Sequence, residues 1–166
     1  MLNTLVILLA AATVLRARPT GKARGLEPRI SALIGAFLVY VIPLFPRREL
    51  SVTAEMVSTL LILFGSAAAI YTLLRLGRSF SLMSEARRLV TSGPYRLVRH
   101  PLYVAEELAI MGLSMQFFSL ATAFVLAVQI AFQFRRMQNE EAVLAETFPE
   151  YAAYRQRTAR LLPGIY

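Results

Sequence analysis

The chain has 166 residues, of which 57% are hydrophobic and 17% charged, and its mean hydropathy is +0.55. Because soluble domains usually contain about 45–50% apolar and about 25% charged residues, we predict a small integral membrane protein with one domain, 1–166. The sequence has no Cys, Trp or Asp and a single His. These absences exclude disulfides, a thiol nucleophile and a Ser-His-Asp triad. They also leave one His and ten Glu as metal ligands, so we expect no metal site.

The formal net charge is +8, which raises the alternative of a nucleic-acid partner. Nucleic-acid domains carry their Lys and Arg on one polar face of a soluble fold. Here the basic residues occupy short gaps between apolar runs, which is how membrane topology is encoded. We therefore expect membrane lipids, and no nucleic acid, as partners.

Three apolar segments in the N-terminal half predict membrane spans at approximately 2–15, 30–45 and 52–76. The first is shorter than the about 20 residues of a usual span. A cleaved signal peptide is the alternative, but no positive charge precedes the apolar stretch, as a signal peptide requires. After these spans, residues 77–101 form a polar connector, and connectors of this length are usually functional.

The next apolar stretch, 102–134, is too long for one span. As a single helix it would extend about 50 Å, against a hydrocarbon core of about 30 Å. A helical hairpin of spans 102–116 and 119–134 fits better. We expect an amphipathic tail, 135–166, in which Pro149 separates two short helices. The predicted fold is an all-α membrane protein with about five transmembrane helices and a helical tail.

The basic residues predict the orientation of these helices. In a five-span layout, sixteen of the eighteen Lys and Arg residues lie on one side, and only Arg47 and Arg48 lie on the other. The positive-inside rule therefore predicts a multi-pass protein whose N-terminus is outside and whose tail is cytoplasmic.

The connector ends in a group of polar residues that suits a binding site. The sequence SGPY (92–95) is typical of a turn. His100 precedes Pro101, which favours the first turn of a helix, and Tyr103 follows within that turn. Free backbone N–H groups at such a helix N-terminus attract anions. The alternative is a basic loop that binds lipid headgroups.

A second polar group lies at the start of the tail. Arg136 and Glu140 are four residues apart and would share one helix face, with Glu141 beside them. Taken alone, this spacing indicates an intrahelical ion pair. The aromatic residues at 148, 151 and 154 recur at helical spacing, which is typical of packing.

Two carboxylates interrupt the fourth predicted span. Glu106 and Glu107 lie in an otherwise apolar helix, where an unpaired charge costs a few kcal/mol. One of them can extend to the membrane surface. The other should face protein, a water-filled cavity or a nearby arginine.

Four segments together resemble the isoprenylcysteine carboxyl methyltransferase family, within the wider group that includes bacterial phospholipid methyltransferases. They are LGRSFS (76–81), LVTSGPYRLVRHPLY (89–103), RMQNEEAVL (136–144) and FPEYAAYRQRTARLLPGIY (148–166). The resemblance covers roughly the C-terminal 90 residues. Its most specific part is the G-P-Y-R-x-V-R-H-P-x-Y motif followed by R-x-x-x-E-E.

The resemblance implies a five-span methyltransferase that uses S-adenosylmethionine in a cytoplasmic-side pocket without a Rossmann fold. No two glycines of this sequence form the G-x-G of that fold. The family motifs imply that Arg136 meets the methyl acceptor. They imply that the cofactor, and its product S-adenosylhomocysteine, contacts Arg87, Arg88, Leu89, Val90, Tyr95, His100, Pro101, Leu102, Tyr103 and Glu140.

The sequence departs from the family in two places. Ala105 stands where Gly is frequent, and the Arg87-Arg88 pair differs from the eukaryotic pattern. The resemblance therefore implies where the cofactor-contacting segment lies in this chain, but it does not imply that the side chains there match those of the family.

The implied reaction is methyl transfer to a lipophilic acceptor with a lipid or prenyl portion. A carboxylate acceptor needs no general base and could be oriented by Arg136, whereas an amine or phenol would need His100 or a Glu as base. Two alternatives remain: a relative of NADPH-dependent sterol-type membrane reductases and a non-enzymatic membrane adaptor.

Overall fold

The computed structural model describes residues 18–164, so the predicted span at 2–15 lies outside the described residues. These described residues form seven helical and strand elements before α4 and three from α4 onward. In chain order they are β1 (Gly21–Lys22), α2 (Glu27–Phe37), the 3-10 helix η1 (Leu38–Leu44), α3 (Val52–Leu76), η2 (Gly77–Ser79), β2 (Glu85–Ala86), η3 (Gly93–Arg96), α4 (Pro101–Gln116), α5 (Leu120–Thr147) and α6 (Tyr151–Arg157).

The helix boundaries follow local capping signals. The Ser51 side chain accepts a hydrogen bond from the backbone N–H of Ala54 at the start of α3, and Gly77, at φ +50°, ends that helix. Ser119 and Thr122 form a reciprocal capping box that starts α5. The segments predicted at 30–45, 52–76, 102–116 and 119–134 are therefore helical in the structure, with a 3-10 helix over Leu38–Leu44. That they span the membrane, the last two as a hairpin, stays a prediction.

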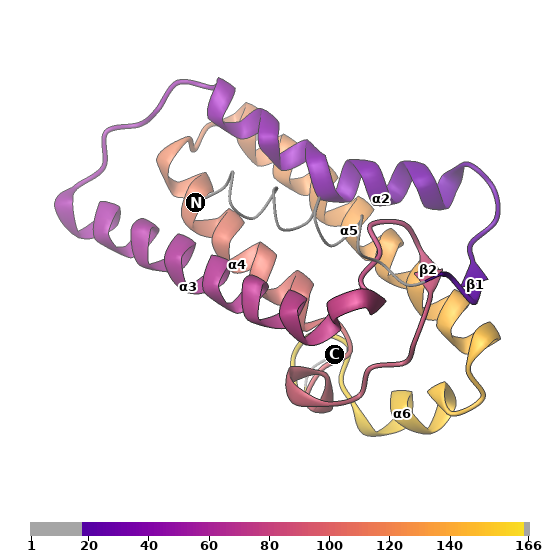
Figure 1. The fold of residues 1–166 in the computed structure, drawn as a ribbon. Coiled ribbons are helices and arrows are strands. Elements are labelled where there is room, and N and C mark those ends of the chain that lie inside the picture. The colour runs from indigo at the N-terminus through magenta and orange to yellow at the C-terminus, as the bar shows by residue number, and fades with distance from the viewer. Residues whose placement is uncertain (1–17, 165–166) are drawn as a thin grey trace.

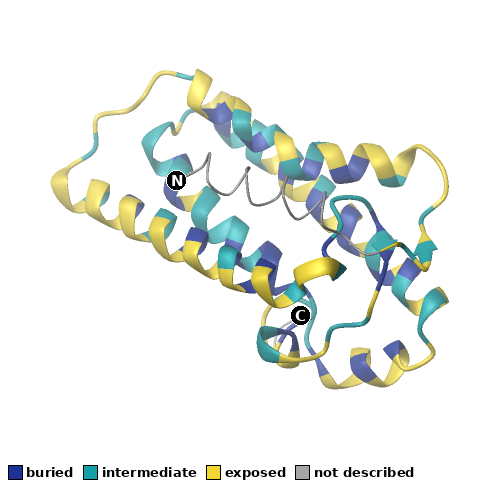
Figure 2. Ribbon diagram, in the orientation of Figure 1, coloured by how far each residue is buried: buried dark blue, intermediate teal, exposed yellow. Residues whose placement is uncertain are grey.

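Two helical segments of the described residues, Glu27–Leu44 and Val52–Ser79, are long and apolar enough to cross a membrane. Figure 2 shows many exposed residues along both segments. Many of these exposed residues are large and apolar, which suits contact with lipid. On α3 these include Val52, Met56, Leu60, Phe64 and Leu74. Membrane association thus has support in the structure, while five crossings remain a prediction.

The tail differs from its prediction. Helix α5 continues without a break from Leu120 to Thr147, so residues 135–147 are the second half of this helix and not a separate short one. At about 1.5 Å per residue, the helix extends about 42 Å, well beyond a hydrocarbon core of about 30 Å. The predicted break at Pro149 is confirmed, and α6 begins at Tyr151.

The helices pack as two pairs, α3 with α4 and α2 with α5 (Figure 1). Glycines allow α3 and α4 to approach closely. A Cβ atom on Gly65 would lie 2.4 Å from the backbone N of Ala109, and one on Gly112 would lie 2.6 Å from the backbone O of Ser58. The Ser58 hydroxyl donates a hydrogen bond to the Gly112 carbonyl over 2.8 Å.

Amides and carboxylates connect the two helix pairs. Gln129 of α5 donates through Nε2 to Glu107 at 2.9 Å and to the Gly35 carbonyl of α2 at 3.2 Å. Gln133 donates to Glu106 over 3.3 Å. Both glutamates of α4 therefore meet protein groups, whereas the sequence led us to expect this of one.

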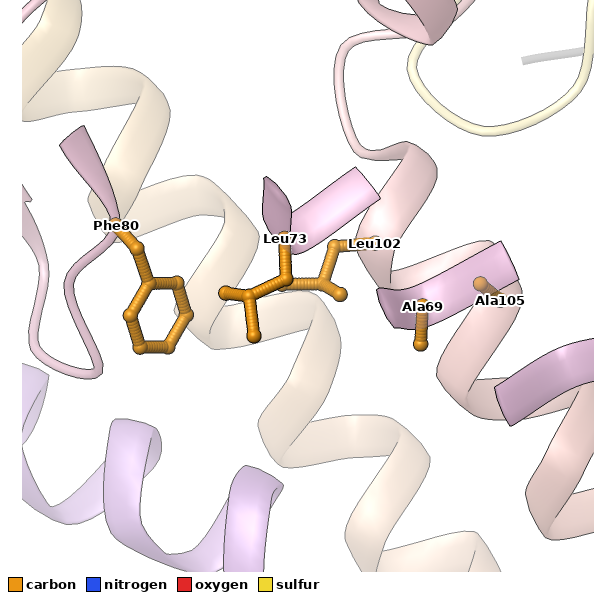
Figure 3. Packing of buried hydrophobic residues seen from close by; sticks show 5 residues of the cluster. All are labelled: Ala69, Leu73, Phe80, Leu102 and Ala105. Carbon is orange, nitrogen blue, oxygen red and sulfur yellow. The ribbon is translucent and has the colours of Figure 1, made fainter. Parts of the chain in front are cut away.

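A small apolar cluster closes the end of the α3–α4 pair near the connector (Figure 3). It consists of Ala69, Leu73, Phe80, Leu102 and Ala105, each at most 6% exposed. Gly65 leaves space opposite the Ala105 backbone, so the alanine at this position is compatible with close packing of the helices.

One short antiparallel pair adds strand structure to the predicted all-α fold. Gly21 of β1 pairs with Ala86 of β2, and Lys22 pairs with Glu85. Flanking backbone hydrogen bonds run from Thr20 N to Ala86 O and from Ala23 N to Ser84 O. The described chain is thus predominantly helical. The paired strands Gly21–Lys22 and Glu85–Ala86, which we call the β1–β2 clip, join the connector to the segment before α2.

We predict that Gly65→Ala destabilises the fold, because its methyl group would force α3 away from the backbone of α4. Overpacking of this kind costs about 1–3 kcal/mol, and thermal unfolding in detergent should show a lowered Tm. Ala68→Val adds bulk on the exposed side of the same helix and should leave the Tm unchanged. Equal Tm values for wild type and Gly65→Ala would contradict the close contact.

Candidate functional site

A cavity of about 110 Å³ lies between the connector, the first turns of α4, the C-terminal half of α5, and α6. Ten of the eleven predicted site residues line it: Arg87, Arg88, Leu89, Val90, Tyr95, His100, Leu102, Tyr103, Arg136 and Glu140. Pro101 is buried in the same turn and is not part of the lining. The structure therefore brings the two predicted polar groups together, and the roles assigned to them stay predictions.

One wall of the cavity is a contact between α4 and α5. The Tyr103 hydroxyl donates a hydrogen bond to Oε1 of Glu140, and Nε of Arg136 donates to the same oxygen over 3.2 Å. The Arg136 guanidinium also lies over the Tyr103 ring, with Cζ 4.9 Å from the ring centroid. The predicted Arg136–Glu140 ion pair is thus present, and its arginine is 3% exposed.

Beside this wall, the Glu141 carboxylate lies within hydrogen-bond distance of three basic side chains. Its Oε1 atom lies 2.8 Å from Nε of Arg99 and 3.2 Å from Nε2 of His100. Arg160 contributes Nε at 3.1 Å from Oε1 and Nη2 at 2.7 Å from Oε2. Burial alone would raise the pKa of Glu141, but the hydrogen bonds from His100, Arg160 and Arg99 outweigh it and hold this pKa well below its ordinary value.

The backbone reinforces this contact. The N–H groups of Arg99 and His100 donate to the carbonyls of Ala159 and Arg160, at 2.9 and 3.1 Å. Val98 and Ala159 form an isolated parallel bridge. The residues after α6 therefore run alongside the end of the connector and position His100 as the N-cap of α4.

His100 and Glu140 both line the cavity, as expected, but they do not pair with each other. His100 faces Glu141, and its ring stacks on Tyr103 with centroids 5.3 Å apart. Glu140 faces Tyr103 and Arg136. Adjacent residues point about 100° apart on a helix, so the two carboxylates serve different neighbours.

Tyrosines form a second side of the cavity. Tyr154 donates a hydrogen bond to the Tyr95 carbonyl over 2.8 Å and packs edge-on against Tyr151. The Tyr151 hydroxyl is buried and has no hydrogen-bond partner among the described residues. Burial raises the pKa of the Tyr95 and Tyr151 phenols, so both are donors at neutral pH.

The connector supplies the third side, where Arg87 has an unusual environment. Its side chain is 2% exposed, and its Nη2 pairs with the Glu85 carboxylate. No described residue accepts a hydrogen bond from its Nε or Nη1. Glu85 in turn accepts from Ser81 over 2.9 Å and lies 3.7 Å from Nζ of Lys22.

Several lining or supporting residues were not among those predicted for the site. Tyr151 and Tyr154 were predicted as packing residues, and they do pack, but they also line the cavity. Arg99 and Glu141 belong to the two polar groups noted in the sequence but were given no role in the site, and Arg160 was not considered.

Comparison with known proteins shows the family to which this chain belongs. The sequence profile of the isoprenylcysteine carboxyl methyltransferase (ICMT) family matches residues 57–146, which is more than half of the chain. The chain belongs to the ICMT family. The matched region contains all eleven predicted site residues and Glu141, whereas Tyr151, Tyr154 and Arg160 follow it.

Two curated relatives are similar to parts of this ICMT-family chain. The cobalt-zinc-cadmium resistance protein CzcN of Cupriavidus metallidurans is 46% identical over 78 residues, which are 46% of this chain and 36% of CzcN. The nickel-cobalt-cadmium resistance protein NccN of Alcaligenes xylosoxydans is 35% identical over 82 residues, 49% of this chain and 38% of NccN. The matches thus span less than two-fifths of either relative.

We predict that Glu141→Gln lowers the stability of this ICMT-family protein at pH 7 by about 3 kcal/mol, because Arg99 and Arg160 lose their buried counter-charge. The pKa of Glu141 is lowered by folding, so its stabilising effect is present above its ordinary value of about 4.3 and is lost as the pH falls below it. Thermal unfolding of both proteins in detergent should show a difference in Tm that narrows below about pH 4.

The control is Glu146→Gln, an exposed position on the same helix, which should unfold like wild type at every pH. A difference between wild type and Glu141→Gln that is independent of pH would contradict the ionised cluster.

Proposed function

We propose that the chain is a membrane methyltransferase that uses S-adenosylmethionine and methylates a lipophilic acceptor, preferably at a carboxylate. The observation that carries the proposal is the convergence of both family motifs on one cavity. Tyr95, His100 and Tyr103 of the first motif line it together with Arg136 and Glu140 of the second, although about 40 residues separate the motifs in the sequence.

The polar groups of the cavity suit this cofactor, which carries a carboxylate, an ammonium, hydroxyls and a sulfonium. Arg87 offers buried nitrogens that lack a partner, and these suit an anionic group. The Glu140 carboxylate can accept hydrogen bonds from an amine or a hydroxyl. When bound, S-adenosylmethionine would supply an activated methyl group on its sulfonium.

The aromatic side chains suit the cationic and planar parts of the same molecule. Tyr95, Tyr151 and Tyr154 stand on one side of the cavity and Tyr103 on another. Aromatic faces attract cations, including those that cannot form hydrogen bonds. This matters here because four arginines also line the cavity and would repel a sulfonium.

A lipophilic acceptor is supported by the apolar side of the cavity. Leu76, Phe80 and Leu102 line it, and Phe80 and Leu102 belong to the cluster between α3 and α4. The exposed face of α3 also carries large apolar side chains, among them Met56, Leu60 and Phe64. We propose that a lipid or prenyl portion reaches the cavity from the bilayer while its polar end meets the arginines.

A carboxylate acceptor is supported by the contacts that the two possible general bases, His100 and Glu140, already make. His100 already faces Glu141, and Glu140 already accepts from Tyr103 and Arg136. An acceptor that must lose a proton would have to displace these contacts. A carboxylate is nucleophilic as it stands, so the protein would need only to align it with the methyl group.

Arg136 is the residue that we propose for this alignment. Its Nε donates a hydrogen bond to Glu140, and the residue lines the cavity. Because Glu140 and the Tyr103 ring fix the guanidinium plane, the terminal nitrogens can orient a carboxylate through charge-assisted hydrogen bonds. The distribution of Lys and Arg further supports a cavity on the cytoplasmic side.

Calorimetric titration of the purified protein tests the cofactor assignment. We expect micromolar binding of S-adenosylhomocysteine and no binding of NADPH. Binding of NADPH alone would favour a reductase, and binding of neither would favour an adaptor. Transfer of labelled methyl groups to a lipid extract should then identify the acceptor, and its absence across lipid and prenyl acceptors would contradict methyl transfer.

A second test separates alignment of the acceptor from cofactor binding. Arg136→Met should reduce turnover by about 100-fold, since removal of one preorganised donor has effects of this size. Its affinity for S-adenosylhomocysteine should change less than about threefold, which is within about 0.7 kcal/mol. Arg135→Met removes the neighbouring, half-exposed arginine and should leave both quantities unchanged. A large loss of cofactor affinity in Arg136→Met would show that its role is wrongly assigned.

A further inference from the structure

Two glutamates of α4 and two glutamines of α5 form a polar cluster within the predicted membrane spans. Gln129 donates a hydrogen bond to Glu107 over 2.9 Å, and Gln133 donates to Glu106 over 3.3 Å. None of these four residues, which we call the Glu–Gln cluster, belongs to the lining of the cavity. Ionisable residues within a membrane span are costly and mark functional sites by default, so the Glu–Gln cluster requires an explanation of its own.

The Glu–Gln cluster has hydrogen-bond acceptors that are not used. Gln129 is 0% exposed and Gln133 is 3% exposed, and both amides are directed at the carboxylates. The Oε1 atoms of both amides are buried and accept no hydrogen bond from a described residue. Turning the amides over would set their oxygens against the carboxylates. Because a buried acceptor without a donor costs free energy, the groups that this cluster lacks are hydrogen-bond donors.

The same cluster carries two carboxylates and no cation. No Lys, Arg or His of the described residues forms an ion pair with Glu106 or Glu107. The charge of Arg136 acts on Glu106, whereas no cation of the described residues acts on Glu107. Charges within membrane spans are stable when they are paired. The group that supplies the missing donors should therefore be positively charged.

The carboxylates can be reached from outside the helix bundle. Glu106 and Glu107 are partly exposed, unlike the two glutamines. Ile130 and Phe134 adjoin the glutamines in the sequence and provide exposed apolar surface on α5. A molecule that enters from the bilayer can thus bring a polar head to the Glu–Gln cluster and keep its apolar part among apolar side chains.

We infer that the Glu–Gln cluster is a binding site, separate from the cavity, for the ammonium group of a lipophilic amine. An ammonium group brings a positive charge and N–H donors and has no acceptor, which matches what the two carboxylates and the two amide oxygens lack. A long apolar chain would hold such a ligand in the bilayer. The inference goes beyond the proposed methyl transfer and does not depend on it.

Thermal unfolding of the purified protein in a non-ionic detergent tests the inference with two probes, dodecylamine and dodecyltrimethylammonium. Both are cations at about pH 7 and have the same alkyl chain, but only the ammonium of dodecylamine has N–H donors. Dodecylamine at about ten times its dissociation constant should raise the Tm of wild type by about 3–6 °C. Dodecyltrimethylammonium should leave the Tm unchanged, because it cannot donate to the amide oxygens or the carboxylates.

Variants of the Glu–Gln cluster locate the binding. Glu106→Gln and Gln133→Leu should each lose most of the rise in Tm, because the first removes a counter-charge of the ammonium and the second removes an acceptor. Glu146→Gln is the matched control, since it removes the same charge from an exposed position on α5, and it should keep the full rise. If Glu106→Gln does not fold in detergent, Glu107→Gln serves in its place.

Three outcomes would overturn the inference. Equal rises with both probes would show attraction by charge alone, and a rise that persists in the cluster variants would show binding elsewhere. No rise with dodecylamine is the result expected if protons alone neutralise the glutamates. The methyltransferase proposal would stand in each case, because it rests on the cavity and is tested by the binding of S-adenosylhomocysteine.

Discussion

A single buried carboxylate, that of Glu141, holds together the segments that enclose the cavity. Arg99 and His100 approach it from the end of the connector, and Arg160 approaches it from the residues after α6. An ionised carboxylate in such a place is stable only when its hydrogen-bonding positions are filled. The positions of the connector, α5 and the residues after α6 therefore depend on one another, because the first and the last supply the partners of the charge that α5 carries.

The adjacent Glu140 shows how one helix can both hold the structure together and present a carboxylate to the cavity. Glu141 points to the cluster of cations, while Glu140 points to the cavity, where Tyr103 and Arg136 hold it. The sequence indicated that the Glu pair and the His100 motif converge. It did not indicate which glutamate meets His100, because the direction of each side chain depends on how α5 is rotated against α4, which only the tertiary packing determines.

The same distinction between local and tertiary signals applies to the fold. Helix α3 was predictable to the residue because a Ser cap, an apolar run and a terminal Gly all lie within it or beside it. The prediction of two helices over 102–134 followed from the length of the apolar stretch and from the distribution of basic residues. By contrast, the strands of the β1–β2 clip have two residues each, too few for a periodic pattern, and they pair across more than sixty residues. The continuity of α5 was missed because a change from apolar to charged composition at Arg135 does not by itself end a helix.

The contact between residues 98–100 and 159–160 has a consequence for the order of assembly during synthesis. Helices α3 and α4 are complete by Gln116 and can pack in the membrane while the ribosome is still producing α5. The carbonyls of Ala159 and Arg160, and the Arg160 side chain, become available only some forty residues later. The cavity is thus closed only after α3, α4 and α5 have been made, and a nascent chain released before residue 159 would contain the packed helices without a closed cavity.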